Sequence, residues 1–312
     1  MNDSHSQHVA KSERAEERGF SLLVIRPGAI GDCLLAMPAI DWLIHRVRHA
    51  SQDEDMHAEV WVPAPVVPLF CCVERVRSIA STGLDQLGIG DLAPPEPLVE
   101  TLCSFDRILS WYGTNRAEFR ASAEAINGHW RFLRALPPRE NRTHAADYFA
   151  AQVGAPAGLP PSLVVEGDGG RHNRIAIHPF SGSKSKNWPL ERYFALKKSL
   201  PAELAARTTF LAGPDEPLEG ALRFDDLAAM ARWLAGARLY IGNDSGISHL
   251  AAAAGVPSIV LFGPTDPAIW APRGREVTCI RHEPIGDLTV EEVLMRTMEV
   301  LGKASKGMVS AS

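Results

Sequence analysis

The chain has 312 residues, a length that suits one large or two medium-sized domains. Its 46% hydrophobic and 22% charged residues are typical of a soluble globular protein with a substantial core. The net charge of −5 argues against a nucleic-acid-binding protein, although local basic patches remain compatible with it. The five cysteines are odd in number and lack CxxC spacing, which favours free thiols in a reducing compartment over a disulfide framework or a zinc site.

The N-terminal segment, residues 1–19, is polar and charged, so we expect a disordered tail rather than a signal peptide. Residues 21–25 then form an apolar run that predicts a strand. Residues 34–47 have helical character, and Pro38 predicts that this helix starts near or just before it.

The loop between this strand and helix contains Gly28, Gly31 and Asp32. The glycines would let a substrate lie against the backbone, and ligands bind at such strand ends in open α/β sheets. Asp32 is placed either to take a proton from an acceptor hydroxyl or simply to cap the helix. The spacing is GxxG, so the dinucleotide-binding fingerprint is absent.

Alternating elements continue through the first half. We expect strands at residues 59–62, 78–80 and 107–111 and a helix at 98–105. Residues 116–142 contain only three glutamates but six arginines, which are Arg116, Arg120, Arg131, Arg134, Arg139 and Arg142. Arg116 and Arg120 share a helical face and could bind an anionic acceptor or membrane headgroups. They could equally belong to a solvated helix surface.

A Gly- and Pro-rich segment, residues 153–174, predicts a linker between two domains. We therefore place an N-terminal domain at residues 20–160 and a C-terminal domain at 161–302, followed by a frayed tail at 303–312.

The second domain is expected to start with a strand at 174–178. The loop that follows contains Ser181, Ser183 and Lys186, which are groups that cradle phosphate, although the Walker spacing is missing. Trp188-Pro189 argues that the loop is anchored, and Pro189 suits a helix start. A strand at 208–212 leads to Glu216, which could hold ribose hydroxyls.

Residues 239–262 predict one βαβ unit: a strand, the turn Asn243–Gly246, an Ala-rich helix at 247–254 and a strand at 258–262. Asp244, Ser245 or Gly246 would cap the helix, and its free N–H groups would attract phosphate. His249 lies one turn into the helix on a face that can meet the same ligand. The alternative is an ordinary capped helix with a core histidine. Residues 224–234, 277–280 and 288–301 complete the pattern as helix, strand and helix, with Thr289 as N-cap.

Three stretches resemble glycosyltransferase family 9, the heptosyltransferases of the lipopolysaccharide inner core. They are RPGAIGDCLLAMPAI (26–40), HPFSGSKSKNWP (178–189) and GNDSGISHLAAAAGVPSIVLFGPTDPAIWAP (242–272). The resemblance implies a GT-B fold of the α/β class: two Rossmann-like domains with parallel sheets that face an interdomain cleft containing the active site.

The resemblance also implies roles for individual residues. Asp32 matches the general base, and Lys186 matches the lysine that faces the donor phosphates. The D-[ST]-G-x-x-H turn that holds the pyrophosphate matches Asp244, Ser245, Gly246 and His249. Glu216 is a looser match for ribose contact. Two departures are Phe180, where the family usually has glycine, and Ser245 in place of threonine.

The implied reaction is an inverting transfer of heptose from ADP-heptose to an anionic glycolipid acceptor of the inner core. It requires no cofactor; the sequence has no DxD-like metal site, so Mg²⁺ would be accessory. The enzyme would be cytoplasmic, peripheral at the inner face of the cytoplasmic membrane, with no nucleic-acid partner. The alternatives are a family member with another nucleotide sugar or another glycan or protein acceptor, a GT-B-like sugar-nucleotide epimerase, and a binding protein that has lost catalysis.

Overall fold

The structure is a computed structural model that describes residues 19–51, 55–70, 73–90, 92–138, 140, 142–163 and 173–309, with side chains described up to residue 302. The predicted N-terminal tail up to residue 18, Cys71, Cys72, Arg139 and part of the predicted linker lie outside the described residues. The other three cysteines are free thiols, as predicted: Cys33, Cys103 and Cys279.

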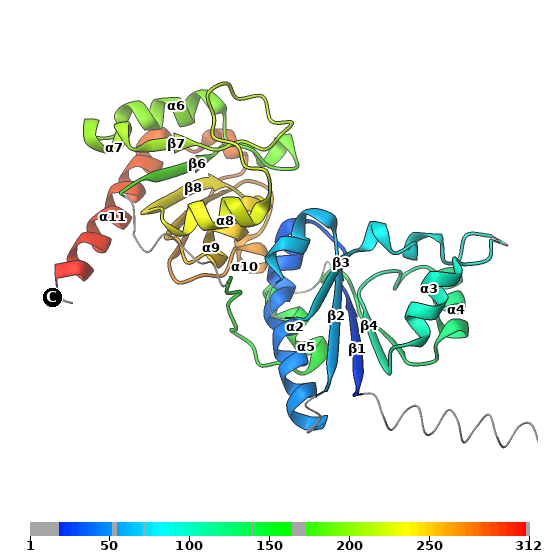
Figure 1. The fold of residues 1–312 in the computed structure, drawn as a ribbon. Helices are drawn as coiled ribbons and strands as arrows, with labels where there is room; N and C mark the ends of the chain where they lie inside the picture. Colours follow the sequence, from blue (N-terminus) through cyan, green and yellow to red (C-terminus); the bar gives the residue numbers. More distant parts are fainter. Residues whose placement is uncertain are drawn as a thin grey trace, which may run out of the picture. The chain divides into compact units, whose positions relative to one another are not determined.

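The first half of the chain forms a parallel five-stranded sheet with the strand order β3-β2-β1-β4-β5 (Figure 1). Its strands are β1 (Ser21–Ile25), β2 (His57–Val62), β3 (Arg75–Ser78), β4 (Arg107–Ser110) and β5 (Trp130–Phe132). Its helices are α2 (Ile30–Ser51), α3 (Glu96–Cys103), α4 (Ala117–Ile126) and α5 (Ala145–Val153), with 3₁₀ turns at Ala64–Leu69, Ile79–Ser81 and Leu84–Gln86.

One face of this sheet presents Leu23, Ile25 and Ile108 to α3 and α4, whose Leu98, Leu102, Phe119 and Ala123 complete a buried cluster. Side chains alternate along a strand, so Leu22 and Val24 point to the opposite face, where they are fully buried. Helices on both faces explain why β1 is an uninterrupted apolar run.

The second half forms another parallel five-stranded sheet, with the order β10-β9-β8-β6-β7. Its strands are β6 (Ile175–His178), β7 (Thr208–Phe210), β8 (Leu239–Asn243), β9 (Ser258–Phe262) and β10 (Val277–Arg281). The helices are α6 (Leu190–Ser199), α7 (Ala202–Ala206), α8 (Leu227–Ala235), α9 (Gly246–Ala253), α10 (Pro267–Trp270) and α11 (Val290–Val309), with 3₁₀ turns at Lys184–Lys186 and Ile285–Asp287.

The core on one face of the second sheet joins strand residues such as Ile177, Ile241 and Ile259 to α6 and α11. Helices α8 and α9 pack against each other, and Figure 1 shows them on the other face. The N-terminus of α11 has the predicted cap: the Glu292 carboxylate accepts from the Thr289 N–H at 3.0 Å, and the Glu292 N–H lies 3.2 Å from Thr289 Oγ1.

The chain divides into two compact units, each discontinuous in sequence. Of the described residues, the first unit contains 19–28, 39–137 and 152–155, and the second contains 29–38, 138–151 and the chain from 156 onward. Residues 29–38, the loop and first turns of α2, therefore group with the second sheet.

Several predicted boundaries are wrong. Helix α2 begins at Ile30 and accommodates Pro38, because the neighbouring Leu34, Leu35 and Met37 are buried and their packing outweighs the lost backbone hydrogen bond. Strand β3 ends at Ser78, and the residues predicted as strand after it form a 3₁₀ turn. Strand β5 and helix α5 have no counterpart among the predicted elements. Helix α11 continues to Val309, past the expected start of the tail.

None of the described helices is long and apolar enough to cross a membrane.

Candidate active site

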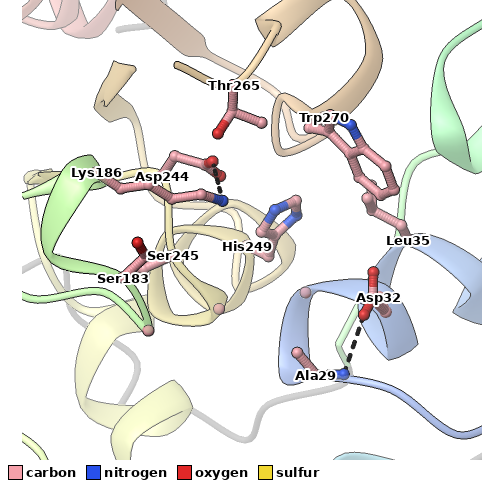
Figure 2. Close-up of a pocket in the computed structure, with 13 residues that line it drawn as sticks. Ala29, Asp32, Leu35, Ser183, Lys186, Asp244, Ser245, His249, Thr265 and Trp270 are labelled. Atoms are coloured by element: carbon pink, nitrogen blue, oxygen red, sulfur yellow. Dashed lines mark hydrogen bonds and ion pairs between the residues drawn. The ribbon is translucent and has the colours of Figure 1, made fainter. Parts of the chain in front are cut away.

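The second sheet reverses its strand order between β6 and β8, which are neighbours in space but not in sequence. At such a switch point the loops after the two strands diverge and leave a crevice at their carboxyl ends. A pocket of about 470 Å³ lies there (Figure 2). Its lining comes from the described second unit: Ala29, Gly31, Asp32, Leu35, Gly182, Ser183, Lys186, Asp244, Ser245, Gly246, His249, Thr265 and Trp270.

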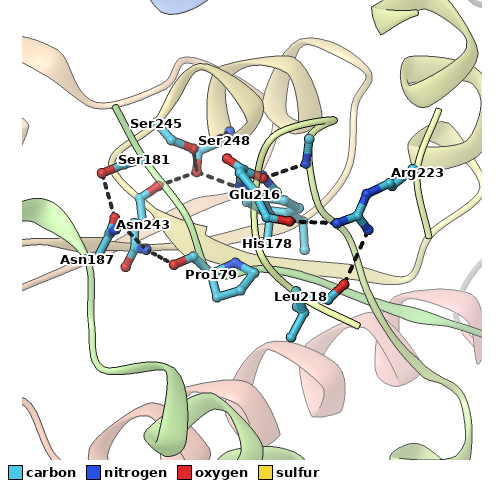
Figure 3. Close-up of polar contacts among 12 residues, drawn as sticks. His178, Pro179, Ser181, Asn187, Glu216, Leu218, Arg223, Asn243, Ser245 and Ser248 are labelled. Carbon is cyan, nitrogen blue, oxygen red and sulfur yellow. Dashed lines mark hydrogen bonds and ion pairs between the residues drawn. The ribbon is translucent and has the colours of Figure 1, made fainter. Parts of the chain in front are cut away.

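The fully buried amide of Asn243, at the end of β8, fixes the loop that contains Lys186. Its Oδ1 accepts from the Trp188 N–H at 3.0 Å and from the Tyr193 hydroxyl at 2.8 Å. Its Nδ2 donates to the Pro179 carbonyl at 2.7 Å, as Figure 3 shows. One side chain thus holds both ends of the loop. The indole of Trp188 is buried and donates to the Leu288 carbonyl at 2.8 Å, so the loop is anchored as predicted.

Lys186 projects from this loop towards Asp244, with 2.7 Å between Nζ and Oδ2 (Figure 2). The carboxylate of Asp244 is 6% exposed, whereas the lysine side chain is 32% exposed. Asp244 therefore orients the ammonium group, and the partly exposed lysine side chain lines the pocket. An anionic ligand can approach the exposed part of this side chain without displacing the ion pair.

The N-terminus of α9 opens onto the same pocket. Of the three candidate caps, Ser245 holds this position, and its hydroxyl accepts from the Ser248 N–H at 3.4 Å. The Ser248 hydroxyl donates to the Asn243 carbonyl at 2.5 Å, which ties the helix to the end of β8. Gly246 is required by space, because a Cβ there would lie 2.7 Å from Ile30 Cβ. The positive end of the helix is thus directed at the pocket beside Lys186.

His249 is 6% exposed and lies against Gly31, where a Cβ would come within 2.8 Å of the imidazole Cδ2. Gly31 therefore allows the histidine to approach the backbone closely. Burial, together with the positive charge of Lys186, lowers the pKa of His249 to about 4 against the opposing effect of Asp244. The imidazole is neutral at pH 7, so it would meet a ligand as a hydrogen-bonding group rather than as a cation.

Asp32 lies in the first turn of α2 and lines the pocket. Its Oδ2 accepts from the Ala29 N–H at 3.0 Å, which is the reciprocal contact of a helix cap. Asp32 thus both caps the helix and lines the pocket, so the capping interpretation and the pocket interpretation of the sequence are compatible. Figure 2 shows Asp32 on the side of the pocket away from Lys186, with His249 between them.

Leu35 and the indole of Trp270 lie side by side and form an apolar wall above Asp32 (Figure 2). The segment after Trp270 is held by two contacts from residues 138–151. His144 Nε2 lies 2.9 Å from the Ala271 carbonyl, and Arg273 pairs with Asp147, with Nη1 2.6 Å from Oδ1. The hydrogen bond from Arg273 lowers the pKa of Asp147.

Five of these lining residues were not predicted as site residues: Ala29, Leu35, Gly182, Thr265 and Trp270. Thr265 and Trp270 follow β9, so the available signal for them was the rule that functional groups collect at the carboxyl ends of parallel strands. Their place in the pocket depends on long-range contacts that no local pattern encodes.

The other predicted site residues are distributed as follows. Ser183 lines the pocket, whereas Ser181 does not: its hydroxyl lies 2.7 Å from Asn187 Oδ1, inside the loop. Glu216 is also absent from the lining. Its carboxylate oxygen Oε2 lies 2.9 Å from His178 Nε2 (Figure 3) and accepts a hydrogen bond from the Gly213 N–H. Burial opposes ionisation, but the contacts to His178 and Gly213 prevail and lower the pKa of Glu216.

Gly28, Arg116 and Arg120 belong to the first unit. Gly28 has φ = 120°, a conformation that favours glycine. Arg116 lies over the Phe119 ring, and Arg120 lies over the Phe132 ring and 3.5 Å from Glu124. Within the described residues, no three His, Cys, Asp or Glu side chains gather as metal ligands.

Comparison with known proteins relates this chain to one family. Lipopolysaccharide heptosyltransferase 1 of Pseudomonas aeruginosa is 53% identical over 49 residues, 16% of this chain and 14% of that protein. Lipooligosaccharide heptosyltransferase 2 of Haemophilus influenzae is 28% identical over 153 residues, 38% of this chain and 44% of that protein. The matches thus span less than half the length of these two relatives.

The fold agrees over a much longer stretch. The ADP-heptose lipopolysaccharide heptosyltransferase II of E. coli covers 92% of this chain and 100% of its own, with a TM-score of 0.65 and 17% identity. The structure of the E. coli heptosyltransferase WaaC with ADP covers 90% of this chain and 100% of its own, with a TM-score of 0.63 and 18% identity. The α/β fold with two parallel sheets is therefore that of the GT-B heptosyltransferases. Residues 139–293 match the model of glycosyltransferase family 9 (heptosyltransferase), and the chain belongs to this family.

Proposed function

We propose that this protein transfers heptose from ADP-heptose to an anionic inner-core acceptor of lipopolysaccharide, with inversion at the anomeric carbon. The observation that supports this most directly is the convergence of Lys186, the N-terminus of α9 and Asp32 on one pocket. The first two bind a diphosphate, and the third is a base within the same cavity. Family membership and a similar structure described with ADP support the nucleotide and the sugar.

The diphosphate of the donor would lie between Lys186 Nζ and the first N–H groups of α9, with Ser183 and Ser245 as hydroxyl donors. As the bond to the sugar breaks, negative charge grows on the departing phosphate oxygen. A fixed ammonium and a helix N-terminus stabilise that charge without rearrangement, and one such preorganised donor is worth roughly 3–4 kcal/mol of barrier. Neutral His249 adds a hydrogen bond.

The acceptor hydroxyl would bind on the Asp32 side of the pocket. It attacks the anomeric carbon from the face opposite the diphosphate and gives its proton to the Asp32 carboxylate. The new C–O bond forms as the old one breaks, and ADP leaves with the bonding electrons. A positioned base contributes about 10² to 10⁴-fold. In this arrangement Leu35 and Trp270 limit the access of water to the reacting atoms.

The acceptor and the cellular location are parts of the proposal that rest on the resemblance. An acceptor on a lipid anchor places the enzyme at the inner face of the cytoplasmic membrane, with Arg116 and Arg120 of the first unit as candidate contacts. Replacing both by glutamine should raise the KM for the acceptor and leave the KM for the donor unchanged.

The first experiment is calorimetric titration of the protein with ADP, UDP, GDP and CMP in one buffer. The proposal predicts a clear preference for ADP, and transfer from ADP-heptose to an inner-core acceptor in a coupled assay. Preference for UDP or GDP would replace the donor but keep a glycosyltransferase. Isomerised donor formed without acceptor would contradict transfer, and the absence of binding to all four would contradict the nucleotide site.

A further inference from the structure

The first unit contains a second cavity, of about 450 Å³, that the proposed reaction does not use. Three arginines line it, Arg46, Arg107 and Arg131, together with an apolar surface. The remaining lining residues are Phe20, Leu43, Val47, Ala50, Ser51 and Val153. None of these described lining residues is acidic. We name this cavity the arginine pocket.

The register of the first sheet explains why two of these arginines meet. Leu22 pairs with Arg107, and Leu109 pairs with Arg131. Paired residues share a face and side chains alternate along a strand, so Arg107 and Arg131 lie on the same face as Leu22. That is the face opposite the Leu23 cluster. The last turns of α2 lie over it, presenting Leu43, Arg46, Val47 and Ala50 at helical spacing.

The contacts of the arginines leave their charge largely uncompensated. Arg131 donates to the Gln152 carbonyl at 2.7 Å, near the end of α5. Arg46 lies over the Trp42 ring at 4.9 Å, and Arg107 lies over the Phe20 ring at 5.7 Å. Aromatic faces orient a guanidinium but do not neutralise it. Among the described residues no ion pair is formed by any of these three side chains.

Helix termini account for only part of this charge. The C-terminal ends of α2 and α5 both reach the pocket, through Ser51 and Val153. Each helix end is equivalent to about −0.5 charge, so the two together offset about one of the three positive charges. The pocket therefore keeps a net positive charge. A phosphate monoester has a charge of about −1.5 to −2 at pH 7 and is an anion that suits such a pocket.

We propose that the arginine pocket binds a phosphate monoester attached to an apolar group, with the phosphate on Arg46 and Arg107 and the apolar group against Leu43, Val47 and Val153. The mixed lining favours this class over inorganic phosphate, which would gain nothing from the apolar side. The ligand can come from a lipid with a terminal phosphate or from a soluble phosphate ester. This inference does not depend on the proposed glycosyl transfer.

The test uses the full chain and the double variant Arg46→Gln/Arg107→Gln. Arg131 is kept because its bond to Gln152 holds α5. The control is Arg207→Gln/Arg296→Gln, which removes two exposed arginines from ion pairs of the second unit. Thermal unfolding followed by circular dichroism checks that both variants fold. The probes are phosphatidylcholine vesicles with and without phosphatidic acid, by co-sedimentation, and phenyl phosphate, by calorimetry.

We expect Arg46→Gln/Arg107→Gln to bind the phosphatidic acid vesicles about 30-fold more weakly than the unchanged protein, because each arginine near an anionic surface contributes roughly fivefold to binding. The control variant should bind these vesicles as well as the unchanged protein. Binding of phenyl phosphate alone, with the same dependence on Arg46 and Arg107, would support the site and assign the ligand to soluble esters. An equal loss in the control would reduce the effect to net charge and overturn the proposal. Binding of none of the probes would overturn it as well.

Discussion

The ion pair between Lys186 and Asp244 leads to a prediction in which a second substitution repairs the first. Lys186→Met removes the cation that would face the donor diphosphate and leaves the buried Asp244 carboxylate unpaired beside it. Two unit charges about 4 Å apart interact by about 4 kcal/mol at an effective dielectric constant of 20. Because a third of the lysine side chain is exposed, we halve this figure to about 2 kcal/mol for the lost attraction.

The unpaired carboxylate adds a repulsion of about 1 kcal/mol, so Lys186→Met should weaken ADP binding by about 100-fold in total. The double variant Lys186→Met/Asp244→Asn removes that repulsion and should bind ADP about fivefold more tightly than Lys186→Met alone. Calorimetric titration with ADP measures both. Lys184→Met is the matched control, because Lys184 is exposed on the same loop and does not line the pocket. Its ADP affinity should remain within about twofold of the unchanged protein, the range of a surface charge.

Two results would refute this reasoning. If Lys186→Met binds ADP as well as the unchanged protein, the diphosphate lies elsewhere. If the double variant binds no better than Lys186→Met, the carboxylate of Asp244 does not face the ligand, and its contribution is limited to orienting the lysine.

Three further expectations concern the same pocket. Asp32→Asn keeps an oxygen for the helix cap but loses the base, so turnover should fall by about 10² to 10⁴-fold with ADP affinity retained; unchanged turnover would exclude Asp32 as the base. The pKa of His249 is about 4 in the folded protein, below its ordinary value of 6.5. As the pH falls from about 6.5 towards 4, the unfolded chain binds a proton at this histidine that the folded protein does not, so the free energy of unfolding decreases. Urea unfolding should therefore lose about 2 kcal/mol between neutral pH and about pH 5, and His249→Gln should remove most of that loss; an identical pH dependence in the variant would contradict the assignment. Asp147→Ala removes the partner of Arg273 and should lower stability by about 2 kcal/mol while raising the KM for the acceptor through a looser Trp270; a KM change confined to the donor would contradict this.

Local sequence patterns predicted most strands of the two sheets, although not β5, and the turn at Asp244, because these depend on short-range signals. The apolar run Ser258–Phe262 and the Ala-rich helix before it were confirmed with boundaries shifted by at most one residue. The resemblance assigned Lys186 and Asp244 to the donor diphosphate, and the structure pairs these two side chains.

The remaining features depend on contacts between residues far apart in sequence. Pro38 was expected near the start of a helix, but burial of the surrounding turns carries α2 past it. Glu216 was expected to face a ribose, but it does not line the pocket, and its carboxylate contacts the Gly213 N–H and His178, which β6 brings to it. Helix α5 was not predicted because its short apolar stretch adjoins the Gly- and Pro-rich segment.

The hydrogen bonds of Asn243 have a kinetic consequence. They are contacts within the fold that hold the Lys186 loop in place, so the entropy of ordering this loop is lost during folding and not during nucleotide binding. A preassembled cradle needs no slow rearrangement after encounter. Association with ADP should therefore proceed in a single phase whose rate is linear in nucleotide concentration, and differences in affinity among variants of the pocket should appear mainly in the rate of dissociation.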